Sequence, residues 1–243
     1  MGVELAIGGA AWRDLVFDSP AMRSPKARPG ILSRPSYDGV KHTLYGANER
    51  VAASILEYFK RLGVVRRWKS APFVRPTAAG TVWRPTFMAE LADDLLLLTI
   101  RVKSDRYLTP EVQQELDHET AAAERAGMKQ LLWTDKKPLT PAFRELYGLV
   151  RRARTVGFDG NDLARLVDFV AVNGSATANQ IVEAGHDPAL IPVGIRQLAL
   201  HTRLDSAIDK ATVVSVKPLV DGRAFLLMTN FDPQEWWNAL EKI

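Results

Sequence analysis

The sequence predicts an α/β protein of two domains, and two patterns carry this prediction. In the first half, a helix, a hairpin, a long apolar strand, a helix, a strand and another helix follow one another, which indicates a central mixed sheet covered by helices. In the second half, three short helices precede a two-stranded ribbon. We expect an extended, Pro-rich basic arm over residues 1–38, an α/β domain over 39–157 and a second domain over 158–243.

The composition is that of a globular protein without membrane or thiol chemistry. The chain has 243 residues, of which 47% are hydrophobic and 25% are charged. Its longest apolar run, Leu95 to Ile100, suits a buried strand and is far too short to span a membrane. The chain contains no cysteine and no recognisable secretory signal, so we expect a cytoplasmic protein without disulfides or thiolate metal sites.

The elements of the first half can be placed from periodicity and from helix-end signals. Apolar residues follow a helical period from Ala47 to Leu62, and Gly63 suits the end of that helix. Two strands are expected at Thr81–Leu91 and Leu95–Val102, and the second is apolar nearly throughout, as a central strand should be. Thr109 is a suitable N-cap for the next helix. A helix, a strand and a helix are then expected at Pro110–Ala126, Met128–Thr134 and Pro141–Arg154.

The second half follows a winged helix-turn-helix pattern. Helices are expected at Asp162–Val172, Thr177–Ala184 and Pro188–Thr202, and a β-hairpin at Ala211–Leu219 and Ala224–Thr229 around Asp221-Gly222. Such a domain can contact DNA through its third helix and its wing, or it can dock onto a protein, and both alternatives stay open. The candidate DNA contacts here are Arg196, Arg203 and Lys210. A last short helix carries Trp236 and Trp237, which we interpret as core or partner contacts.

Positive charge is concentrated before the central strand. From Tyr58 to Arg84 there are seven basic residues and no acid, and Trp68 and Trp83 stand among them. A single-sign stretch of this kind attracts a phosphate backbone, although a solvated basic surface is the alternative interpretation. The candidate DNA contacts in this stretch are Arg66, Arg67, Lys69, Arg75 and Arg84.

Three short motifs fall on this frame in an order that suits metal-dependent phosphate chemistry. Glu49 lies in the first helix, Thr86 follows a proline at the start of the hairpin strand, and Arg101 and Lys103 end the central strand. In nucleases of the restriction-endonuclease fold, a helix Glu, an Asp after Pro, and an acid or Gln two residues before a Lys meet at one sheet edge. There the carboxylates hold magnesium and the Lys stabilises developing charge.

The ordered set resembles the TnsA endonuclease family. That family has a Leu-Glu-Arg helix, a Pro-Phe step, a Pro-Asp-Phe motif and an acid-or-Gln–x–Lys pair, in this order. The resemblance covers roughly residues 23 to 155 and the position of the winged helix. The corresponding motifs here are Asn48-Glu49-Arg50, Ala71-Pro72-Phe73, Pro85-Thr86-Phe87 and Arg101-Val102-Lys103.

The resemblance implies a restriction-endonuclease-like fold and a 5′-strand endonuclease of cut-and-paste transposition, with magnesium as cofactor if the site is active. It also implies three partners: double-stranded DNA, a separate transposase subunit that cuts the other strand, and an ATP-dependent regulator. A second hypothesis, from a different class, is a catalytically inactive, nuclease-derived component that binds DNA or protein in a transposon complex or a phage particle.

Two positions depart from the family's pattern. Thr86 stands where the metal-binding Asp is expected, and Arg101 stands where the Gln or acid is expected. A hydroxyl carries no charge, and a guanidinium repels a divalent cation at close range. Glu49 and Lys103 therefore remain as catalytic candidates, with Glu49 as a weak magnesium ligand or none. We expect cleavage to be weak or lost, and an Arg101–Glu49 ion pair filling a dead metal site is the alternative to surviving catalysis.

Overall fold

The computed structural model describes residues 16–18, 31–32, 42–44, 46–136, 138–155, 157–204 and 207–227. Most of the expected arm, and the expected helix with Trp236 and Trp237, lie outside these residues. The chain divides into two compact units that meet between residues 137 and 138. The division comes before helix α4 (Pro141–Arg152), not at residue 157, because α4 packs against helix α7 (Leu190–Gln197) of the second unit.

The first unit is built on a mixed four-stranded sheet, so the expected α/β class with a central mixed sheet is confirmed. Its strand order is β3-β6-β7-β8. The pairs β3–β6 and β6–β7 are antiparallel, and the pair β7–β8 is parallel. The strand expected to be central from its apolar sequence, Leu95–Val102, contains β7, which lies inside the sheet between β6 and β8, and the first four residues of β7 are buried. All five residues of β6 are buried as well. The strands span Val65–Ser70 (β3), Phe87–Leu91 (β6), Leu97–Val102 (β7) and Met128–Trp133 (β8).

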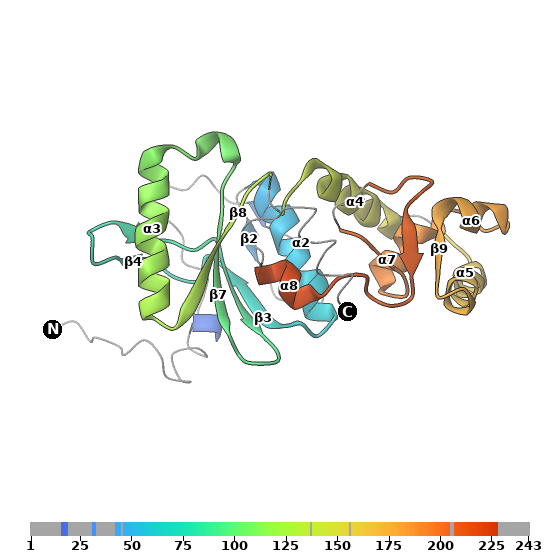
Figure 1. Ribbon diagram of the computed structural model, residues 1–243, viewed down its shortest axis with the longest axis horizontal. Coiled ribbons are helices and arrows are strands. Elements are labelled where there is room, and N and C mark those ends of the chain that lie inside the picture. Colours follow the sequence, from blue (N-terminus) through green and yellow to red (C-terminus); the bar gives the residue numbers. More distant parts are fainter. Residues whose placement is uncertain are drawn as a thin grey trace. The chain divides into compact units, whose positions relative to one another are not determined.

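Two helices cover the sheet, one on each face (Figure 1). Helix α2 (Ala47–Arg61) packs on β3 and β7 and is followed by Gly63 in a left-handed conformation. Helix α3 (Pro110–Arg125) packs on β8. The side chain of Thr109 accepts a hydrogen bond from the Val112 N–H, which confirms the expected N-cap.

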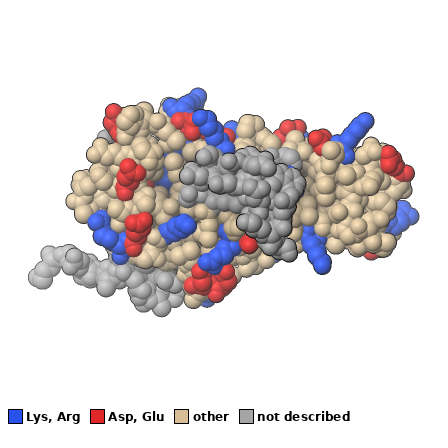
Figure 2. All heavy atoms as spheres, in the orientation of Figure 1, with Lys and Arg blue, Asp and Glu red and all other residues tan. Residues whose placement is uncertain are grey.

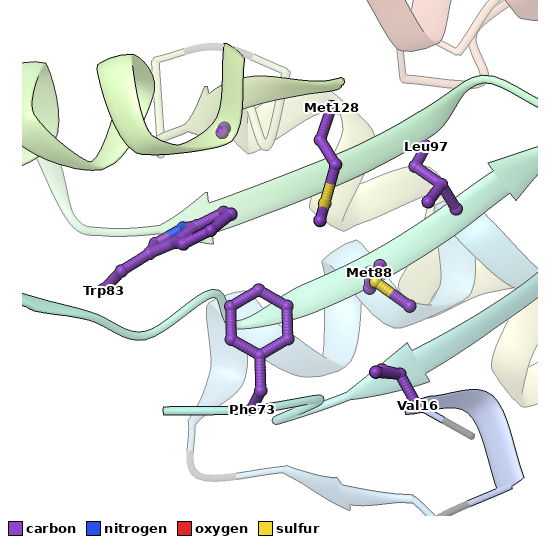
Figure 3. Close-up of a cluster of buried hydrophobic side chains, with 7 residues drawn as sticks. Val16, Phe73, Trp83, Met88, Leu97 and Met128 are labelled. Carbon is purple, nitrogen blue, oxygen red and sulfur yellow. The ribbon is translucent and has the colours of Figure 1, made fainter. Parts of the chain in front are cut away.

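A two-stranded ribbon and a hydrophobic cluster complete the face of the sheet next to α3. The ribbon consists of β4 (Arg75–Pro76) and β5 (Val82–Trp83), and β5 packs against α3. Figure 3 shows side chains from β5, β6 and β7 meeting Met128 and Val16 in one apolar layer. The buried members of this cluster are Val16, Phe73, Trp83, Met88, Leu97, Ala123 and Met128.

The described part of the second unit contains five α-helices, one 3-10 helix and a small antiparallel sheet. Its strand order is β10-β11-β9, so β11 lies in the middle. Side chains of Thr140, Asp159 and Thr177 cap the helices that follow them, which explains where α4, α5 and α6 begin. The remaining elements are the 3-10 helix η2 (Ala153–Thr155), α5 (Gly160–Val172), β9 (Ser175–Thr177), α6 (Ala178–Glu183), β10 (His201–Thr202), β11 (Val213–Ser215) and α8 (Gly222–Leu227).

The expected hairpin at Ala211–Leu219 and Ala224–Thr229 is wrong. Its first half contains β11, but β11 pairs with β9 and β10, and the segment expected to be its partner contains α8. Asp221 explains the difference. Its carboxylate accepts hydrogen bonds from the N–H groups of Arg223 and Ala224, so Asp221-Gly222 begins a helix rather than turning a hairpin.

Candidate functional site at the end of the central strands

The sheet brings three of the four predicted motif positions to one end. The register pairs Phe87 with Ile100, so Thr86, just before β6, lies opposite Arg101 near the end of β7. Lys103 follows directly, and its N–H donates to the Trp133 carbonyl of β8 at 3.0 Å. We refer to Thr86, Arg101, Lys103 and the helix residue Glu119 as the strand-end cluster.

Glu49 lies toward the same end of the sheet, but on the helix of the other face. Helix α2 leads into β3, whose first residue Val65 pairs with Leu91 at the far end of β6. The first turn of α2, which contains Glu49, is therefore at the end where β7 finishes (Figure 1). Helix α3 covers the opposite face of the sheet and supplies Glu119, the acid of the strand-end cluster. Glu49 therefore lies on a different helix and on the other face.

Thr86 uses its hydroxyl inside the sheet. Its Oγ accepts a hydrogen bond from the Val102 N–H at 2.9 Å, and its own N–H donates to the Ile100 carbonyl at 2.8 Å. The side chain thus extends the pairing of β6 with β7 by one step. The position at which the family resemblance predicts a metal-binding Asp is thus occupied by a neutral hydroxyl that holds the strand end.

Arg101 is held by groups of its own unit. Its Nη1 donates to the carbonyl of Arg84 and lies 3.7 Å from Oε1 of Glu119 on α3. The Arg101 side chain is 18% exposed and that of Glu119 is 2% exposed. The alternative that Arg101 pairs with Glu49 is therefore wrong: among the described residues, its ion pair is with Glu119.

Glu119 is a buried acid with several weak partners. The Arg84 N–H donates to its Oε1 at 3.4 Å, and Nε2 of Gln130 donates to its Oε2 at 3.5 Å. Gln130 in turn accepts from the hydroxyl of Thr99 on β7. Burial raises the pKa of Glu119, while Arg101, the Arg84 N–H and Lys103 act in the opposite direction.

Lys103 lies among charges of both signs. Burial lowers the pKa of its ammonium, the neighbouring Arg101 lowers it further, and Glu115 and Glu119 raise it. The two acids that raise it both lie on α3. This arrangement can hold an anion or stabilise a carboxylate, and the acids nearest to Lys103 lie on α3, not on β6 or β7.

The strand-end cluster does not fit magnesium. A hard divalent cation needs several oxygen ligands and more than one negative charge. Within the described ranges, no group of three or more His, Asp or Glu side chains could hold a metal ion. The Thr86 hydroxyl is engaged, and the one buried carboxylate faces a guanidinium.

Glu119 is the site residue that the sequence interpretation missed. Leu116, Glu119 and Ala123 are the buried residues of α3. They are separated by three and four positions, the spacing of one helix face. In the sequence, the signal for this residue is a Glu within an otherwise apolar helix face. It indicates a buried ion pair only together with the cation on the facing strand, Arg101.

The basic residues of β3 serve internal contacts. Arg66 and Arg67 both reach Glu90 of β6, at 3.5 and 2.7 Å, and the Glu90 side chain is 1% exposed. Lys69 is buried, and its Nζ donates to the carbonyls of Val16 and Phe17. Burial lowers the pKa of Lys69, as expected for an ammonium inside a protein.

The other predicted DNA contacts differ in exposure. Arg84 is exposed, whereas Arg75 of the β4–β5 ribbon is half-buried. In the second unit, Lys210 is exposed and Arg203 is half-buried. These positions remain candidate phosphate contacts.

Helix α7 leaves little surface for reading bases. Arg196 is half-buried, and α7 packs against α4, α5, η2 and β10. Five of its eight residues are buried: Leu190, Ile191, Val193, Gly194 and Ile195.

No family model matches the chain, and no curated protein matches it. None of the helices in the described part of the chain is long and apolar enough to cross a membrane. Figure 2 shows Lys and Arg side chains interspersed with Asp and Glu over the described atoms of one face, without a continuous area of one charge.

Proposed function

We propose that the chain is a TnsA-like, nuclease-derived subunit of a DNA-processing assembly, which binds duplex DNA without cleaving it. The observation that carries the loss of cleavage is the engagement of Arg101 by the Arg84 carbonyl and Glu119. Unit charges at 4 Å interact by about 4 kcal/mol at an effective dielectric of about 20, so a divalent ion beside this guanidinium is strongly disfavoured.

The proposal also includes the fold family of each unit. In the first unit, the order α2, β3, β6, β7, α3, β8 supports a restriction-endonuclease-like core. In the second unit, β9 precedes α6 and α7, and β10 and β11 follow them to form the sheet β10-β11-β9. This order supports a winged helix whose wing is the segment between β10 and β11, with Lys210 in it.

The proposed setting is a transposition complex in the cytoplasm. The partners are double-stranded DNA, a transposase subunit and an ATP-dependent regulator, and they rest on the motif resemblance. Magnesium is no part of the proposed role, because the strand-end cluster lacks the ligands.

Binding of a labelled random-sequence duplex to the full chain, with magnesium or with EDTA at equal ionic strength, tests this proposal. We expect affinities in the two conditions to agree within about twofold, because phosphate contacts by arginine and lysine need no metal. Thr86→Asp with Arg101→Gln is the matched variant, and we expect magnesium to strengthen its binding, provided that its thermal unfolding shows that it folds. Absence of duplex binding by wild type, or wild-type binding that requires magnesium, would contradict the proposal.

A further inference from the structure

Three exposed arginines stand together at the end of α4. Arg151 and Arg152 are its last two residues, and Arg154 lies in η2, which follows directly. All three are exposed, and we call them the α4 arginine cluster. Ala153, between them, is 4% exposed. The cluster therefore projects from a backbone that is anchored in the core of the second unit.

Unlike Arg66, Arg67 and Arg101, these arginines have no ion pair with an acid of the described part of the chain. Residues 146–158 include no Asp or Glu. The nearest acids along the chain are Glu145 and Asp159. A helix C-terminus favours cations, which accounts for Arg151 and Arg152 in structural terms but not for Arg154, beyond the last turn of α4.

The position of the cluster connects it with α7. Both α4 and η2 pack against α7, the helix that would face DNA in a winged helix. Since α7 is mostly buried, the surface available near it is provided by its neighbours. The α4 arginine cluster contributes three exposed basic residues to the elements packed against α7.

We infer that the α4 arginine cluster binds the phosphate backbone of duplex DNA, independently of base sequence. This inference rests on the proposed function, because it assumes that the chain binds duplex DNA. Guanidinium groups match phosphate oxygens in a bidentate fork, and exposed arginines without an acid partner have no internal ion pair to give up on binding. Each phosphate that they neutralise releases counterions.

The test compares two triple variants of the full chain that remove the same charge. Arg151→Gln/Arg152→Gln/Arg154→Gln removes the cluster, and Arg125→Gln/Lys129→Gln/Arg165→Gln removes three exposed cations elsewhere. The affinity for a labelled random-sequence duplex is measured over a series of salt concentrations. We expect the cluster variant to bind at least about tenfold more weakly and its log–log salt slope to fall by about 2 to 3, at roughly 0.9 for each lost contact.

The outcomes separate this inference from the proposed function. Wild-type binding with an unchanged cluster variant overturns the inference and leaves the proposed function standing. Equal losses in both triple variants also overturn it, because net charge alone would then explain the effect. No binding by wild type overturns both. Thermal unfolding checks that the variants fold, and Arg154→Gln alone, outside α4, should lower the slope by about 1 if the triple variant does not fold.

Discussion

The arginines of the sheet and the arginines at the end of α4 lie in opposite electrostatic environments. Arg67 on β3 and Arg101 on β7 each contact a buried glutamate, Glu90 and Glu119. The α4 arginine cluster is exposed and has no ion pair among the described residues. A cation on a covered sheet face needs an anion, because burial without one is costly, whereas a cation at a helix end remains in water.

This difference changes which basic segment is interpreted as a DNA surface. The segment from Tyr58 to Arg84 contains more basic residues, but in it Arg66, Arg67 and Lys69 are tied to Glu90 or to backbone carbonyls. The shorter segment around Arg151 contains fewer cations, and they face solvent. The two segments differ in how far their basic side chains are exposed to solvent, and this exposure matters more here than the number of charges.

The largest expected effect follows from removing Glu90, the buried acid that contacts Arg66 and Arg67 of β3. Glu90→Ala should lower the free energy of unfolding by about 3 kcal/mol, because it leaves Arg67 partly buried without its anion. Arg151→Ala is the matched substitution in the other segment, and it should change stability by less than about 0.5 kcal/mol. Urea denaturation of both variants measures the contrast. Equal effects would show that the two sets of arginines do not differ as described.

A smaller effect is expected at Glu119, and it depends on pH. Burial raises the pKa of Glu119 above its ordinary value of 4.5, so the folded protein retains a proton that the unfolded chain releases. Wild type should therefore lose stability through this group as the pH rises above 4.5 through the raised pKa, and Glu119→Gln should not. Urea denaturation across this pH range should show that the free energy of unfolding of Glu119→Gln increases relative to that of wild type as the pH rises. If the difference in the free energy of unfolding between the two proteins does not change with pH, or changes in the opposite direction, the raised pKa of Glu119 is contradicted.

The sequence predicted the elements that local signals define. Helices α2 and α3, Gly63 after α2 and the Thr109 cap of α3 follow from periodicity and capping, and all are present. The hairpin failed because β11 finds its partner in β9, far back along the chain, while Asp221 caps a helix. Pairing over such a distance is decided by packing, which a local pattern does not contain.

The candidate site shows the same limit. The placement of Thr86 opposite Arg101 follows from the ends of two adjacent strands, and the structure has it. The partner of Arg101 could not be chosen from the sequence, because Glu49 and Glu119 both lie on helices beside the sheet. Which acid meets the arginine depends on the face that each helix covers, and α3 supplies Glu119.

Nicking of supercoiled DNA by the full chain in the presence of magnesium tests most directly the proposal that the strand-end cluster does not support metal-dependent cleavage. We expect no nicking above the level of a metal-free control, because Thr86 and Arg101 are engaged within the domain and the residues that the structure describes include no group of three or more His, Asp or Glu side chains that could hold the ion. Magnesium-dependent nicking by wild type that disappears on Lys103→Ala would contradict this account and would show that the cluster remains an active nuclease site.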